Sequence, residues 1–194
     1  MPSEYAYENE LKVENLTQEI IEKITKEMAK FHKETSSKDE QKNFGSVEIL
    51  SKNWEDLFLK VEDFKNLTIS INHFYFIRQK ILKFMKLHKD VFEKRMNEGK
   101  IKPLFIDNAI IVDVALDVAS VFCSLQFLGK QDFANLFIQK YLENNPDESL
   151  NDVLDFYKSW RCFLRGYQLS NEQKKDDAQK YFKMSRDFAD KLKN

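Results

Sequence analysis

The chain has 194 residues, of which 42% are hydrophobic and 13% aromatic, and its formal net charge is −1. This length and apolar content are enough for one domain with a buried core. Because 31 basic and 32 acidic residues nearly cancel, the basic excess typical of a general nucleic-acid binder is missing. The polar, acidic N-terminus does not resemble a signal peptide. No apolar run approaches the roughly 20 residues that span a bilayer, so we expect a cytoplasmic protein.

Most of the chain is predicted to be helical, since only 4 glycines and 3 prolines interrupt it. Residues 1–16 form a polar N-terminal segment, and 17–194 are predicted to form a single helical domain. Residues 103–112 can add one short β-hairpin, so the expected fold class is mainly α. Helices are expected over about 17–33, from Ser46 onward, over about 70–97, up to Leu128, over 131–144, from the Asn145 cap and Pro146 onward, and over about 171–192.

The cysteines and histidines do not form a metal-binding pattern. Cys123 and Cys162 lie in apolar helical runs without a C-x-x-C pair, and we expect buried free thiols. His32, His73 and His88 lack the spacing of four residues that places two ligands on one helix face. Ordinary surface or partly buried roles are therefore predicted for the histidines. The glycines are also too far apart to form a phosphate-binding loop.

Acidic residues lie inside the otherwise apolar run from 105 to 122. Asp113 and Asp117 are four residues apart and share a helix face. Their carboxylates could hold Mg²⁺, cap backbone amides, or pair with Arg161 and Arg165, which are also four apart. The two arginines could instead bind a phosphate. We favour structural ion pairs, because such pairs are common buried polar anchors.

Five segments, taken in order, resemble one family. They are ITKEMAKFH, FGSVEILSKNWEDLF, FMKLHKDVFEKRMNEGKIK, VDVALDVASVFCSLQFLGKQDFANLFIQKYLE and FYKSWRCFLRG. Together they resemble the aminoglycoside-phosphotransferase-like domain that bacteria and archaea fuse to a P-loop ATPase-type kinase domain. The resemblance covers about residues 18–170. It implies the helical large lobe of a protein-kinase-like fold.

The chain departs from this family at the residues that would carry out catalysis and bind the nucleotide. In the family, Gly-x-Ile leads into His-Gly-Asp-x-His, whose aspartate is the catalytic base. Here Gly99-Lys100-Ile101 leads instead to Lys102 and then to Asp107, so the catalytic loop looks deleted. The resemblance matches Asp107 to the acid that binds Mg²⁺, and the small lobe with its nucleotide lysine is missing. Because phosphoryl transfer needs all of these parts, we do not expect a kinase that acts alone.

The favoured hypothesis is a non-catalytic, degenerate phosphotransferase-like domain that serves as a binding or interaction module without a cofactor. Its partner would be a protein, a second copy of the chain, or a small ligand in the old substrate cleft. One alternative is a split or minimal phosphotransferase. There a partner chain supplies the nucleotide lobe, and Asp107 and Asp113 hold Mg²⁺ beside ATP or GTP. The other alternative is an unrelated helical protein-interaction domain. None of the three involves nucleic acid or a membrane.

Overall fold

A computed structural model describes residues 16–105 and 109–193 of the chain. Over these residues it is mainly helical, with one antiparallel pair of strands, which confirms the predicted fold class. The elements are α2 (Gln18–Glu34), α3 (Asp39–Lys42), η2 (Asn43–Gly45), α4 (Val47–Val61), η3 (Glu62–Phe64), α5 (Ile71–Leu87), α6 (Lys89–Asn97), β1 (Ile101–Pro103), β2 (Ile111–Asp113), α7 (Val114–Phe127), α8 (Gln131–Asn144), α9 (Leu150–Asn171) and α10 (Lys175–Asp190).

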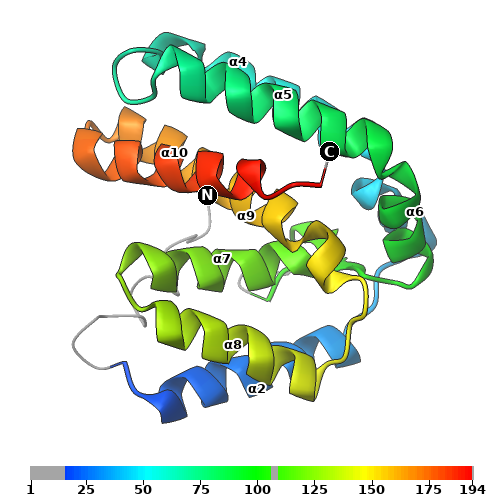
Figure 1. Ribbon diagram of the computed structural model, residues 1–194. Helices are drawn as coiled ribbons and strands as arrows, with labels where there is room; N and C mark the ends of the chain where they lie inside the picture. Colours follow the sequence, from blue (N-terminus) through cyan, green and yellow to red (C-terminus); the bar gives the residue numbers. More distant parts are fainter. Residues whose placement is uncertain (1–15, 106–108, 194) are drawn as a thin grey trace.

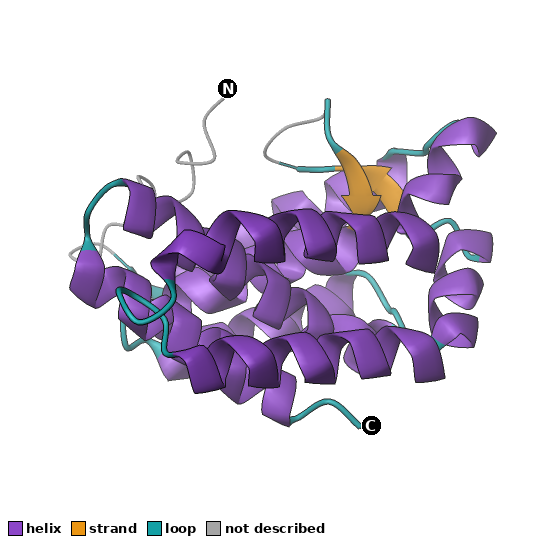
Figure 2. Cartoon of the chain, turned by 90° about the horizontal axis from the view of Figure 1, so that it is seen from above, coloured by secondary structure: helices purple, strands orange, loops and turns teal. Residues whose placement is uncertain are grey.

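The long helices pack side by side around one hydrophobic core. Helix α2 contacts α8, α8 contacts α7, α7 contacts α9, α9 contacts α10, and α10 contacts α5. Figure 1 shows α4 and α5 at one end of this order and α2 and α8 at the other. Seen from above, the strand pair lies at one edge of the helical body (Figure 2). Within the described ranges, every helix is too short or too polar to pass through a bilayer.

Side-chain caps explain where the first long helices begin. Helix α2 begins after Thr17, whose side chain accepts a hydrogen bond from the backbone amide of Ile20. Helix α4 begins after Ser46 in the same way, with the amide of Ile49 as donor. Each cap satisfies an amide that has no partner within its helix, so both helices start where predicted.

Some predicted helix bounds are wrong. The helix expected over 70–97 is two helices, because the chain turns at His88, which ends α5 and precedes α6. The imidazole of His88 bonds the carbonyl of Lys193 at 2.7 Å and anchors this corner. Pro146 does not begin a helix either, since α9 begins only at Leu150. The intervening Asp147 instead accepts a hydrogen bond from a buried arginine, which is described below.

Cys123 and Cys162 are buried and not disulfide-bonded, as predicted. The predicted N-terminal segment lies outside the described residues, apart from Leu16.

Candidate functional site

The strand pair positions Asp113 at the start of α7. In the register of β1 and β2, Ile101 lies opposite Asp113 and Pro103 lies opposite Ile111. Strand β2 runs directly into α7, so Asp113 is both the last strand residue and the helix N-cap. Its Oδ1 accepts a hydrogen bond from the amide of Ala115 at 2.8 Å. A carboxylate is favoured there because it neutralises the positive end of the helix dipole.

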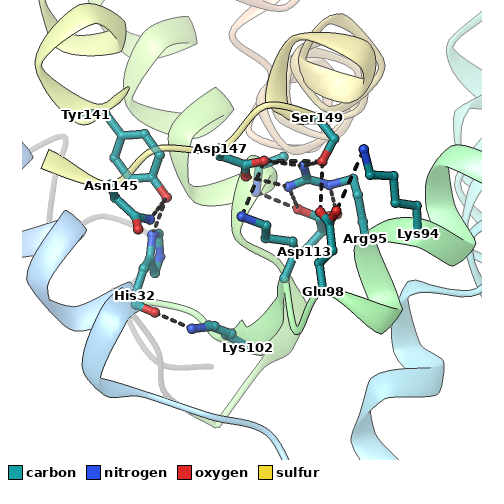
Figure 3. A network of polar contacts seen from close by, with 12 residues as sticks. His32, Lys94, Arg95, Glu98, Lys102, Asp113, Tyr141, Asn145, Asp147 and Ser149 are labelled. Atoms are coloured by element: carbon teal, nitrogen blue, oxygen red, sulfur yellow. Dashed lines mark hydrogen bonds and ion pairs between the residues drawn. The ribbon is translucent and has the colours of Figure 1, made fainter. Parts of the chain in front are cut away.

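Asp113 is bound by a buried arginine from α6. Arg95 is 0% exposed, and its Nε and Nη2 reach the two oxygens of Asp113 at 2.7 Å each. The same guanidinium bonds both oxygens of Asp147, at 3.1 and 3.2 Å, and the hydroxyl of Ser149 at 2.8 Å. We call these four residues the Arg95 cluster (Figure 3). It ties together α6, the strand pair and the segment before α9.

The charges of the Arg95 cluster stabilise one another. Burial alone would lower the pKa of Arg95, but the charges and hydrogen bonds of Asp113 and Asp147 outweigh burial and raise this pKa above its ordinary value. Burial alone would raise the pKa of Asp147, but Arg95 and then Lys100 hold it below its ordinary value. Lys100 lies 3.4 Å from Asp147. Arg95 and Lys100 therefore both stabilise the charged form of the Asp147 carboxylate.

A second buried network surrounds His32. Its Nδ1 lies 2.9 Å from the hydroxyl of Tyr141, and its Nε2 lies 3.0 Å from Oδ2 of Asp117. The tyrosine hydroxyl also accepts a hydrogen bond from Asn145 at 2.9 Å (Figure 3). Oδ2 of Asp117 accepts a further bond from the backbone amide of Phe105 at 2.7 Å. This network joins α2, α7 and α8, and burial raises the pKa of Tyr141 above its ordinary value.

The predicted surface or partly buried role of His32 is therefore wrong, because this side chain is 1% exposed. A signal for its burial was present in the sequence. Ile21, Thr25, Met28 and His32 follow one another at intervals of three or four residues, which places them on one helix face. All four are buried. The apolar stripe of α2 should have been extended by one turn to include the histidine.

The structure also corrects the predicted partners of the aspartates. Asp113 bonds Arg95 and Asp117 bonds His32, whereas neither bonds Arg161 or Arg165. Arg165 lies 3.4 Å from the side chain of Gln168 and 3.5 Å from that of Glu172. It also lines a cavity with Phe127 and Leu128, at the end of α7 opposite to Asp113. The predicted shared helix face does not describe the aspartates, because Asp113 is the N-cap of α7 and bonds α6, whereas Asp117 lies within α7 and bonds α2.

The predicted metal pair is Asp107 and Asp113, and only Asp113 lies within the described residues. Asp107 lies outside them. Both oxygens of Asp113 are bound to Arg95, at 2.7 Å. Among residues 16–105 and 109–193, no three His, Cys, Asp or Glu side chains form a group that could hold a metal ion. Oδ1 of Asp117 is buried and has no hydrogen-bond partner among the described residues.

A small pocket adjoins Asp113, between α4, β2, α7 and α9. Its volume is about 90 Å³, and we call it the aromatic pocket. Its lining consists of Phe44, Ile49, Leu50, Asn53, Trp54, Ile111, Val112, Asp113, Leu116, Phe156, Tyr157 and Trp160. Nε1 of Trp54 is buried and has no hydrogen-bond partner among residues 16–105 and 109–193. No local pattern in the sequence distinguishes a pocket wall from core.

Comparisons with known proteins give this chain no relatives. No family model matches it, and neither the curated proteins nor the solved structures contain a match.

Proposed function

We propose that this chain is a non-catalytic binding module built on a phosphotransferase-like helical scaffold. The observation that carries the proposal is the state of Asp113 within the Arg95 cluster. A magnesium ligand must offer a carboxylate oxygen to the ion. Both oxygens of Asp113 are instead held at 2.7 Å by a fully buried guanidinium. Releasing one of them would leave Arg95 partly unpaired in the interior, which is strongly unfavourable.

Asp117 supports the same conclusion. One of its oxygens accepts hydrogen bonds from His32 and from the amide of Phe105, at 3.0 and 2.7 Å. The carboxylate is 1% exposed, so water and substrate do not reach it directly. We assign to Asp117 the role of holding α7 against α2 and against Phe105, which follows β1. The two acidic side chains then serve the scaffold rather than phosphoryl transfer.

The aromatic pocket is the part of the scaffold to which we assign binding. Its wall is mostly aromatic and aliphatic, and it lies beside Asp113 and strand β2. The scaffold therefore has an identifiable place for a ligand in the cleft beside the strand pair.

A thermal-shift titration tests whether the chain binds the nucleotides that a phosphotransferase uses. ATP and GTP would each be added with and without Mg²⁺, and we expect no change in melting temperature. A ligand at 100 times its dissociation constant would stabilise the fold by about 2.7 kcal/mol, which is readily detected. A rise that needs both Mg²⁺ and nucleotide, and that is lost in Asp107→Asn, would overturn the proposal. Asp39→Asn is the matched control, because that carboxylate is 92% exposed.

A further inference from the structure

A larger pocket lies at the other end of α7 from the aromatic pocket. It forms where the last turn of α7 meets the corner between α9 and α10, and its volume is about 290 Å³. We call it the Arg165 pocket. Its lining consists of Ser124, Phe127, Leu128, Arg165, Leu169, Lys174, Asp177 and Tyr181.

We propose that the Arg165 pocket binds a free α-amino acid with a large apolar side chain. Such a molecule carries a carboxylate, an ammonium group and an apolar portion, and the wall of the pocket has a counterpart for each of the three. This site is separate from the aromatic pocket, so it goes beyond the proposed function and is tested on its own.

Apolar and aromatic side chains form one part of the wall. They are Phe127, Leu128, Leu169 and Tyr181. The rings of Phe127 and Tyr181 stack on each other, with centroids 4.2 Å apart and planes 7° apart, so each ring holds the other in place. An apolar ligand side chain placed against this wall would be removed from water, which favours binding.

Arg165 is the counterpart for the ligand carboxylate. It is 8% exposed and is therefore a mostly buried cation in the wall of the pocket. A guanidinium is always charged, and its planar fork binds both oxygens of a carboxylate through two parallel hydrogen bonds. Lys174 lines the same pocket and adds a second positive charge.

A carboxylate of the protein shows that these two cations are close enough to share one carboxyl group. Oε1 of Glu172 lies 3.5 Å from Nη1 of Arg165, and Oε2 of Glu172 lies 2.8 Å from Nζ of Lys174. Glu172 itself is not among the described residues that line the pocket. The side chains of Lys174 and Glu172 are 58% and 29% exposed, and ion pairs of this exposed kind are weak. A ligand carboxylate would therefore compete with Glu172 for the same cations.

Asp177 is the counterpart for the ammonium group. It lies in the first turn of α10 and lines the pocket together with the two cations. A carboxylate in the first turn of a helix also interacts favourably with the helix dipole, which is the competing explanation for this residue. Asp176 lies in the same turn but is not among the described lining residues, so it separates the two explanations.

The volume of the pocket suits a large side chain. A cavity of about 150 Å³ holds benzene in a protein interior. The Arg165 pocket, with about 290 Å³, is almost twice as large. Lys174 and Asp177 are exposed, so the charged groups of an amino acid would lie at the mouth of the pocket and its side chain deeper inside.

Titrations of the full chain with four compounds, followed by ¹H–¹⁵N spectra, test the proposal. Phenylalanine has all three groups, 3-phenylpropanoate lacks the ammonium group, phenethylamine lacks the carboxylate, and alanine lacks the ring. We expect phenylalanine to bind at least about ten-fold more tightly than each of the others and to shift the amide signals of residues that line the pocket. Absence of binding, or equal affinity for 3-phenylpropanoate, would overturn the proposal.

Two variants test the carboxylate site. Arg165→Met should weaken the binding of phenylalanine and 3-phenylpropanoate about ten-fold and leave phenethylamine binding unchanged. Glu172→Gln should tighten phenylalanine binding, because it removes the competing carboxylate, and it remains informative if the arginine variant does not fold. Unchanged phenylalanine affinity in Glu172→Gln would contradict the assignment of the carboxylate to these cations.

A matched pair of variants tests the ammonium site. Asp177→Asn should weaken the binding of phenylalanine and phenethylamine, whereas 3-phenylpropanoate binding should not weaken. Asp176→Asn is the control, because it removes a carboxylate from the same helical turn outside the pocket. Equal phenylalanine affinities in these two variants would mean that Asp177 serves only the helix, and the assignment to an amino acid would fail.

Discussion

Replacing Arg95 by methionine should destabilise the fold by about 3–5 kcal/mol, because it leaves buried carboxylates without their partner. The arginine is 0% exposed and donates five hydrogen bonds, two to Asp113, two to Asp147 and one to Ser149. Methionine is of similar length, so most of the loss is electrostatic rather than a cavity. Lys100 lies 3.4 Å from Asp147 and remains in this variant. Asp113 therefore loses more of its electrostatic stabilisation than Asp147 does.

Urea unfolding at pH 7, followed by far-UV circular dichroism, measures this loss. Arg95→Lys keeps the charge but not the planar fork that binds both oxygens of Asp113, so we expect an intermediate loss. Adding Asp113→Asn to Arg95→Met removes one uncompensated charge and should recover part of the stability. A loss below about 1 kcal/mol in Arg95→Met, as is typical of exposed ion pairs, would refute the structural role assigned to the cluster.

Two further predictions concern acid stability and helix packing. The pKa of Asp147 is lowered in the fold, so its stabilisation is present above the unfolded value of about 3.9 and is lost as the pH falls through the folded value. Melting temperatures measured from pH 6 to 2.5 should therefore fall less steeply in Asp147→Asn than in the natural chain. In Gly166→Ala, the new Cβ would lie 2.9 Å from the ring of Phe182 in α10, and overpacking of this kind costs about 1–3 kcal/mol. Urea unfolding would show the loss, whereas an unchanged midpoint would mean that the ring moves aside.

Sequence reasoning succeeded where the signal is local. The caps Thr17 and Ser46 act within their own first turns, and the predicted starts of both helices agree with the structure. The bounds of α8 also agree, since Gly129 ends the preceding helix with a φ of +74° that favours glycine. The failures at His88 and Pro146 have a common cause. In both places a polar group is satisfied by a distant segment, and a local pattern does not contain that segment.

The site was harder to predict than the fold, because its pairs are distant in sequence. Arg95 is 52 residues from Asp147, and His32 is 85 residues from Asp117. Residue types and helical spacing showed that the aspartates needed partners, since unpaired carboxylates are rarely buried. Which partner each aspartate bonds depends on how α6 and α2 pack in the fold. Sequence periodicity does not show that packing.

Asp113 connects the Arg95 cluster to the aromatic pocket, because it bonds Arg95 and also lines the pocket. Tyr157 lies in the same wall, and burial together with the charge of Asp113 raises the pKa of its hydroxyl well above the ordinary value. Both oxygens of Asp113 are aligned with the guanidinium of Arg95, and Oδ1 also caps α7. The three hydrogen bonds that Asp113 accepts thus fix the start of α7, and with it one wall of the pocket, relative to α6.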